Sequence, residues 1–167
     1  EATEYLIQLG HKRIGFVTQD FSDVKSRHER YQGFIDALAK SGIPLQEQTI
    51  LYWQRETGFQ QSPQSILQAD NASTVFFTQH LAITTELLTQ LNQAHISIPE
   101  DISLLGFDYL PMAEFFKVPI TVVKQDPHEI GMAAAKLLLE NIDGKAPDFQ
   151  RVMIPCALVI RESCNKL

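Results

Sequence analysis

The chain has 167 residues, 44% of them hydrophobic, so it can bury the core of one domain or of two small lobes. It carries 14 lysines and arginines against 20 aspartates and glutamates, which gives a net charge of −6. A protein that grips nucleic acid needs a cationic surface to displace counterions from the phosphates. The composition therefore argues against DNA binding by this chain itself.

Neither a membrane segment nor a secretory leader is indicated. No apolar run approaches the roughly 20 residues that span a bilayer, and residues 1–4 do not begin a basic and then apolar leader. They are typical of the inside of a helix, so we expect the chain to have been cut from something longer. Cys156 and Cys164 have neither CxxC nor zinc-site spacing, and we expect reduced thiols in a cytoplasmic protein.

Hydrophobic periodicity predicts helices and strands in alternation. In chain order, the expected elements are a helix over 2–9, a strand over 14–17, a helix over 27–41, a strand over 49–52, a helix over 57–69, a strand over 74–77, a helix over 80–95, strands over 102–105 and 120–123, a helix over 127–143, and strands broken by Pro155 over 151–161. Pro63 indicates that the third helix either starts there or is kinked. Asp126 and Gly144 are suited to begin and end the last helix.

The strands are short and almost wholly apolar, and most of them are separated by helices of about a dozen residues or more. Such strands are typical of a parallel sheet covered by helices on both faces, because neither face then meets water. The sequence therefore predicts an α/β fold built from parallel βαβ units.

Polar side chains follow the predicted strands at the edge where open parallel sheets bind ligands. They supply one guanidinium, one indole, one carboxylate and several hydroxyls and amides: Arg30, Trp53, Asp108, Ser22, Ser26, Thr78, Gln79, His80, Lys124 and Gln125. Arginine donates and aspartate accepts hydrogen bonds of hydroxyl groups, and an indole can cover the C–H face of a sugar ring. The set suits a neutral polyol.

Each main candidate also has a purely structural interpretation. Trp53 could be a core residue, Arg30 a surface ion-pair residue, and Asp108 a turn or cap residue. The convergence of the three at one edge of the predicted sheet favours a ligand site.

Catalytic patterns are missing from the sequence. The five histidines have no metal-ligand spacing, and there is no GxSxG elbow, phosphate-binding loop or GxGxxG fingerprint. His80 has no evident orienting partner for a role as general base. We therefore expect no enzyme activity, no catalytic residues, no metal and no cofactor.

Five stretches in order resemble motifs of the LacI/GalR family of transcription regulators. Leu9–Phe16 resembles Leu-Gly-His-(Lys/Arg)-(Arg/Lys)-Ile-Gly, Ile98–Asp108 resembles Val-Pro-Glu-Asp-Val-Ser-Val-Val-Gly-Phe-Asp, and Leu158–Cys164 resembles the ending Leu-Val-Val-Arg-Glu-Ser-Cys. Arg30–Phe34 and Ile120–Gln125 add weaker matches. Together they extend over the whole chain.

The resemblance implies a periplasmic-binding-protein-like core of two α/β lobes with a cleft between them. Residues 1–124 and 157–167 would form a nearly complete C-terminal lobe, and 125–156 would be a remnant of the N-terminal lobe, without the DNA-binding headpiece. The ligand-binding residues that it implies are Ser26, Arg30, Trp53, Gln79, Asp108 and Gln125. The pair Gln79-His80 departs from the family's usual Asn-Asp at that place, and Val24 is apolar where some members are polar.

The function implied is the sensing core of a LacI-type regulator. A small-molecule effector, a sugar or sugar derivative, would bind in the cleft and control operator binding by the absent helix-turn-helix. The resemblance further implies a cytoplasmic homodimer without membrane contact. The alternatives are a periplasmic sugar-binding protein of a transport system and, more remotely, an enzyme on a flavodoxin-like or nucleotide-binding sheet.

Overall fold

The computed structural model describes residues 1–21, 24–109, 117–144 and 151–167. Its helices and strands follow one another as α1 (Ala2–Gln8), β1 (Ile14–Thr18), α2 (Lys25–Lys40), the 3₁₀ turn η1 (Leu45–Glu47), β2 (Thr49–Gln54), β3 (Gly58–Phe59), α3 (Pro63–Leu67), β4 (Val75–Thr78), α4 (Leu81–Gln93), β5 (Ser103–Phe107), β6 (Thr121–Lys124), α5 (Pro127–Ile142) and β7 (Ala157–Val159). The expected alternation of helices and strands is confirmed, and the class is α/β.

The seven strands form one sheet in the order β3-β2-β1-β4-β5-β6-β7. The five inner strands are parallel, while β3 runs antiparallel to β2 and β7 antiparallel to β6. The chain leaves β1 toward β2 on one side and later returns to β4 on the other side. The switch point of the sheet therefore lies between β1 and β4, where doubly wound folds open a crevice for ligands.

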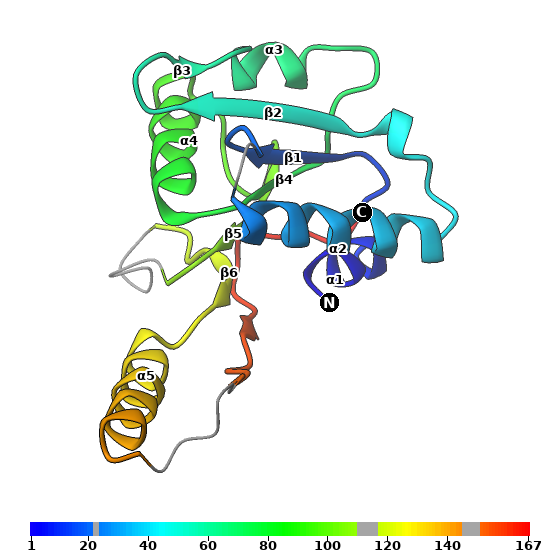
Figure 1. Cartoon of the computed structure of the whole chain (residues 1–167). Coiled ribbons are helices and arrows are strands. Elements are labelled where there is room, and N and C mark those ends of the chain that lie inside the picture. The colour runs from blue at the N-terminus through cyan, green and yellow to red at the C-terminus, as the bar shows by residue number, and fades with distance from the viewer. Residues whose placement is uncertain (22–23, 110–116, 145–150) are drawn as a thin grey trace.

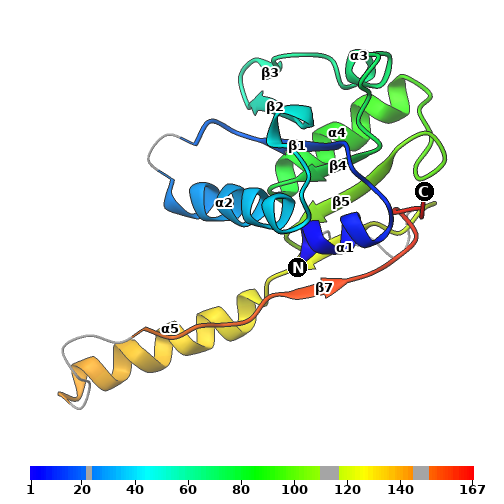
Figure 2. The same ribbon diagram turned by 90° about the vertical axis from the view of Figure 1, so that its right-hand side faces the viewer.

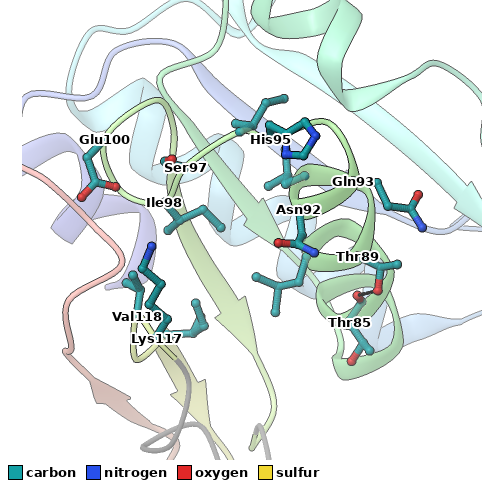
Figure 3. Close-up of a pocket in the computed structure, with 14 residues that line it drawn as sticks. Thr85, Thr89, Asn92, Gln93, His95, Ser97, Ile98, Glu100, Lys117 and Val118 are labelled. Carbon is teal, nitrogen blue, oxygen red and sulfur yellow. Dashed lines mark hydrogen bonds between the residues drawn. The ribbon is translucent and has the colours of Figure 1, made fainter.

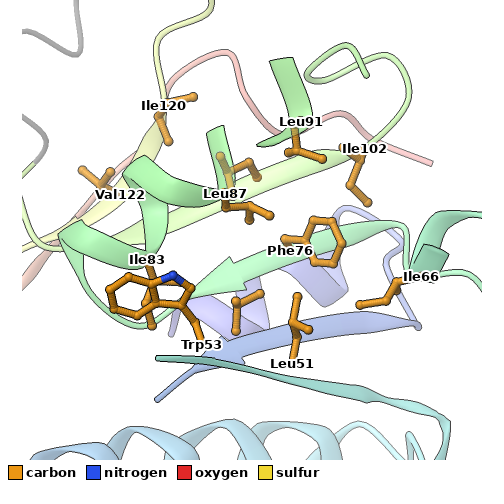
Figure 4. Close-up of a cluster of buried hydrophobic side chains, with 12 residues drawn as sticks. Leu51, Trp53, Ile66, Phe76, Ile83, Leu87, Leu91, Ile102, Ile120 and Val122 are labelled. Carbon is orange, nitrogen blue, oxygen red and sulfur yellow. The ribbon is translucent and has the colours of Figure 1, made fainter. Parts of the chain in front are cut away.

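Helices cover both faces of the sheet, as the apolar strands predict (Figures 1 and 2). Side chains alternate along each strand, so Phe76 points to one face while Val75 and Phe77 point to the other. Phe76 packs in the cluster beneath α3 and α4, with Leu87 and Leu91 of α4 (Figure 4). Val75 and Phe77 belong to the cluster beneath α1 and α2.

The C-terminal segment is fastened to the sheet by buried hydrogen bonds. The Ser163 hydroxyl accepts from the backbone N–H of Thr121 at 2.8 Å and donates to the carbonyl of Leu104 at 2.6 Å. The backbone N–H of Leu167 then donates to the carbonyl of Leu9 at 2.8 Å. The last residues therefore pass across the amino ends of β5 and β6 and reach the end of α1.

Helix α5 stands apart from the sheet in both views (Figures 1 and 2). Its start is fixed locally, because the Asp126 carboxylate accepts from the backbone N–H groups of His128 and Glu129 at 3.0 Å each. No residue of α5 is buried, and the side chains of Leu138 and Leu139 are 62% and 63% exposed. The helix is amphipathic by sequence, yet the described residues bury none of its apolar side chains.

Two sequence predictions are wrong in detail. The helix predicted over 57–69 is confined to α3, because residues 58–59 form β3 in a hairpin with β2, where Gly58 adopts φ +77°. The alternative in which that helix starts at Pro63 is confirmed. The strands predicted over 151–161 shrink to β7, since only Ala157–Val159 find a partner, β6. No helix among the described residues is long and apolar enough to cross a membrane.

Candidate functional site

The carboxyl ends of the parallel strands bring polar side chains from distant parts of the chain to one edge of the sheet. Gln19 follows β1, Gln79 and His80 follow β4, Asp108 follows β5 and Gln125 follows β6. Gln79 is also anchored by its backbone N–H, which donates to the carbonyl of Val17 at 3.0 Å. This edge includes the switch point between β1 and β4.

Arg30 reaches this edge from α2. It lies one turn before the buried Phe34, so its side chain is carried on the core-facing side of the helix. Its Nη1 donates to the carbonyl oxygen of Gln79 at 2.7 Å, and its Cζ lies 3.8 Å from the ring centroid of Phe107. Burial lowers the pKa of Arg30 and the nearby Asp108 opposes this shift, but a guanidinium stays charged at any physiological pH.

Gln79 is the most unusual polar residue of the edge. Its side chain is 1% exposed, and neither its Nε2 nor its Oε1 has a hydrogen-bond partner among the described residues. A buried amide left unpaired costs about 1–3 kcal/mol, so such groups call for an explanation. A ligand that supplies one acceptor and one donor would satisfy both atoms.

Gln79 and Arg30 line the same cavity of about 300 Å³. The rest of the lining comes from the start of α1, from α2 and from the strand ends, and it is mainly apolar apart from Glu1, Thr3 and Cys156. Mainly apolar walls with a few polar groups are usual for a small-molecule site. The lining residues are Glu1, Ala2, Thr3, Arg30, Gly33, Phe34, Phe77, Gln79, Phe107, Val123, Cys156 and Leu158.

Asp108 is held next to this cavity in a strained conformation. Its φ is +77°, which is rare for a residue with a side chain, and its backbone N–H donates to the carbonyl of Val123 at 2.9 Å. The Nε2 of Gln125 donates to Asp108 Oδ1 at 3.0 Å. Strain of this kind clusters at functional sites. Here the Asp108 carboxylate accepts from Gln125 through Oδ1, and Oδ2 has no bond to Gln125.

A second polar group joins β1, α2 and β4. The Gln19 Oε1 accepts from Arg27 Nη2 at 2.6 Å and lies 2.9 Å from His80 Nε2. Because an amide oxygen only accepts, His80 must donate through Nε2. Burial lowers the pKa of His80 and the arginines Arg27, Arg30 and Arg55 lower it further, while Asp108 opposes them. His80 is therefore neutral near pH 7, with Nδ1 free of a proton.

Four of the six predicted ligand residues do not line the cavity, and two of these, Trp53 and Ser26, lie away from its polar groups. Trp53 is 7% exposed and packs in the core near Ile83 (Figure 4), with its ring edge-on to His80 at a centroid distance of 6.0 Å. Ser26 is exposed in the first turn of α2. The structure brings Arg30 and Gln79 together at the cavity, and it pairs Asp108 with Gln125 beside it. Ser22 lies outside the described residues.

Gln19, Arg27 and Phe107 belong to this edge but were not predicted as site residues from the sequence. Phe107 was visible as the residue after Gly106 at a strand end, and Arg27 lies one helical turn before Arg30. No sequence pattern singled out Gln19. It directly follows β1, which ends at Thr18 rather than at the predicted Val17.

A larger cavity of about 980 Å³ lies elsewhere, along α4 and the segments that precede β5 and β6 (Figure 3). Asn92, His95, Glu100 and Lys117 are among the residues that line it. Its strands contribute their amino ends, whereas ligands of open parallel sheets bind beyond the carboxyl ends. We therefore assign the candidate site to the smaller cavity despite its size. Among the residues that the structure describes, no group of His, Cys, Asp and Glu side chains could hold a metal ion.

Comparison with known proteins gives a consistent result. The model of a family described as periplasmic binding protein-like domains matches residues 3–164. The transcriptional repressor CytR of Escherichia coli is 31% identical over 169 residues, covering 100% of this chain and 49% of CytR. The repressor PurR of Actinobacillus pleuropneumoniae is 30% identical over 170 residues, covering 99% of this chain and 50% of PurR.

Similar solved structures point to the same kind of protein. A LacI family regulator from Enterococcus faecium with bound ribose superimposes with a TM-score of 0.84 at 30% identity, covering 99% of this chain and 61% of that one. A LacI family regulator from Enterococcus faecalis, also with bound ribose, gives 0.82 at 27% identity over 99% of this chain and 59% of that one. The chain spans about half the length of the curated relatives it matches. It belongs to the family of periplasmic binding protein-like domains, as found in transcription regulators of the LacI type.

Proposed function

We propose that the chain senses a small-molecule effector, a sugar or a sugar derivative, for a LacI-type transcription regulator. The observation that carries the proposal is the buried Gln79 amide, whose two polar atoms have no partner among the described residues, in a residue that lines the same cavity as Arg30. An effector that pairs both atoms would recover the energy of leaving them unsatisfied.

The chemistry of the edge supports a polyhydroxylated ligand. Arg30 offers further guanidinium donors, and Asp108 offers acceptors for hydroxyl hydrogens. In the proposed site Ser26 and Gln125 add polar contacts once the cleft is whole, and Trp53 supports the site through its edge contact with His80. The two Enterococcus regulators were solved with ribose, which supports a sugar as the first ligand class to test.

We propose further that residues 1–124 and 157–167 form one lobe and that 125–156 belong to a second lobe. The exposed apolar face of α5 supports this division, because Leu138, Leu139 and Ile142 then have the second lobe to pack against. The effector would touch both lobes and favour a closed cleft. To move the ratio of closed to open molecules from 1:99 to 99:1, the effector must bind the closed form about 5.5 kcal/mol more tightly than the open form.

In the regulator, closure would change how two subunits of a homodimer meet and so reorder the helix-turn-helix headpieces on operator DNA. We place this function in the cytoplasm, where the operator is. The relatives named above are transcription repressors and regulators rather than enzymes, and we propose no catalytic activity, metal or cofactor for the site.

Calorimetric titration of the full-length product of the gene that encodes this chain, with a panel of sugars that includes D-ribose, tests the proposal. We expect saturable binding that Arg30→Ala and Asp108→Ala each weaken at least about tenfold, since each removes hydrogen bonds to a charged group. Gln32→Ala is the matched control, because Gln32 lies on the exposed side of α2 and contacts Asp36. Binding that neither site variant weakens would contradict the assignment.

A further inference from the structure

Resting on the proposed function, we propose that the effector carries a negatively charged oxygen group, a phosphate or a carboxylate, which binds between Arg27 and Arg30. This group lies at the end of the site formed by β1, β4 and α2. The hydroxyl-bearing part of the ligand extends toward Asp108.

Two guanidinium groups flank the Gln79–His80 dipeptide at the end of β4. Arg30 Nη1 donates to the Gln79 carbonyl at 2.7 Å. Arg27 Nη2 donates at 2.6 Å to Gln19 Oε1, which also accepts from His80. Both guanidiniums are partly buried and donate to residues that directly follow β1 and β4. Each keeps further N–H donors for a ligand, because a guanidinium has five.

Among the described residues, the acceptors that hold the two guanidiniums are all neutral. Arg30 binds a carbonyl oxygen, and Arg27 binds an amide oxygen and the carbonyl oxygen of Asp20 at 2.7 Å. In the described part of the chain, every ion pair within 4.0 Å has a lysine or the N-terminus as its cation. Arg30 lines the cavity and Arg27 does not, and neither guanidinium has a carboxylate of the described residues within 4.0 Å.

Other charged groups near this end of the site do not cancel the positive charge of Arg27 and Arg30. Arg55 adds a third positive charge within electrostatic reach of His80. Asp108 interacts electrostatically with Arg30, but its carboxylate accepts a hydrogen bond from Gln125. The charge of Asp20 raises the pKa of Tyr52. Three guanidiniums, Arg27, Arg30 and Arg55, act on His80 against one carboxylate, Asp108, although the whole chain has a net charge of −6. A local excess of positive charge on a chain whose net charge is negative is expected where an anion binds.

The buried side-chain amide of Gln79 is a second observation that points to a ligand at this place. Gln79 is 1% exposed, and its buried Nε2 has no partner among the described residues. An anionic oxygen that accepts from Arg30 would lie in the same cavity as this N–H donor. The remaining Oε1 would accept from a hydroxyl group of the ligand.

Matched ligand pairs test the inference with the full-length gene product. D-ribose is compared with ribose phosphate, and D-glucose with glucuronate, so that the arms separate phosphate from carboxylate. We expect the charged member of at least one pair to bind at least about tenfold more tightly than its neutral partner. Arg27→Gln should remove about that factor for the charged member and leave the neutral member unchanged.

Lys25→Gln is the control, because it removes the same charge from the same helix where Lys25 pairs with Glu29 in solvent. Arg27→Lys, which keeps the charge, should retain most of the preference. If Arg27→Gln fails to fold, the preference of the parent protein should still shrink between about 0.05 M and 0.5 M salt. Neutral members that bind as tightly as charged ones, still dependent on Arg30 and Asp108, would overturn this inference and leave the proposed function intact. Failure of every ligand to bind would overturn both.

Discussion

Arg30 donates to the carbonyl oxygen of Gln79 at 2.7 Å, while the side-chain amide of the same glutamine has no partner among the described residues. The bond fixes the backbone of Gln79 relative to α2. The unpaired amide beside it is therefore held in position rather than left free to find a partner. This combination is costly for folding and useful for binding, which gives the first prediction.

Gln79→Leu should stabilise the chain. The substitution keeps nearly the same volume and the backbone bond to Arg30, but it removes two buried polar atoms that have no partner. We expect the free energy of unfolding in urea to rise by about 1–2 kcal/mol, while sugar binding is lost.

Gln48→Leu is the matched control for that experiment. Gln48 Oε1 accepts from the backbone N–H of Ile14 at 2.8 Å, and its Nε2 donates to the carbonyls of Lys12 and Pro44. The same substitution should here lower the free energy of unfolding by about 1–3 kcal/mol. Equal effects at both glutamines would mean that the Gln79 amide is satisfied in solution.

Ser163→Ala should destabilise the attachment of the C-terminal segment. The hydroxyl joins β6 to β5 through the N–H of Thr121 and the carbonyl of Leu104, and the residue is fully buried. We expect a loss of about 1–3 kcal/mol in urea unfolding. Ser65→Ala, at an exposed serine whose hydroxyl donates to the Ser62 carbonyl, should change stability by less than about 0.5 kcal/mol.

Gly15→Ala should be strongly destabilising. A methyl group added at Gly15 in β1 would lie 2.6 Å from Cδ1 of the fully buried Phe76. We expect a loss of about 1–3 kcal/mol. Gly33→Ala is the contrasting case, because nothing lies within 4 Å of an added methyl in this helical glycine, and it should gain about 0.5–1 kcal/mol. A tolerated Gly15→Ala would contradict the packing described here.

His11 should make folding sensitive to acid. Its ring is fully buried between the Thr74 hydroxyl and the carbonyl of Asn165, and burial lowers its pKa below the ordinary 6.5. The unfolded chain takes up this proton near pH 6.5, before the folded chain does. The stability is therefore complete above that pH and falls as the pH drops below it, by at most about 1.4 kcal/mol per pH unit for one group.

His11→Gln should remove part of that pH dependence. His80 contributes in the same direction, because its pKa is also lowered, so the informative quantity is the difference between the parent chain and the variant. Urea unfolding at a series of pH values measures it. A variant whose stability falls with the same slope as the parent would show that His11 is not responsible.

The order of helices and strands could be read from the sequence because burial on two faces leaves short apolar strands, and because caps such as Asp126 act locally. The carboxyl-edge rule likewise located Arg30, Gln79, Asp108 and Gln125. The orientation of Trp53 was harder. It shares the buried face of β2 with Leu51, two residues away, so strand alternation could have indicated a core position.

Other features depend on tertiary contacts that no local pattern encodes. The short strand β3 exists because Gly58 allows a hairpin in a stretch that looks helical. Arg27 and Gln19 become part of the site only through the bond between them and through His80. Residues 151–156 read as a strand by composition, but the described structure offers them no neighbouring strand.

A crystal structure of the full-length gene product with the sugar that binds most tightly tests the central claim most directly. The account predicts ligand density within hydrogen-bonding distance of Arg30 and of both polar atoms of the Gln79 side chain. Ligand density in the groove along α4, near Asn92 and Lys117, with the Gln79 amide still unpaired would contradict it.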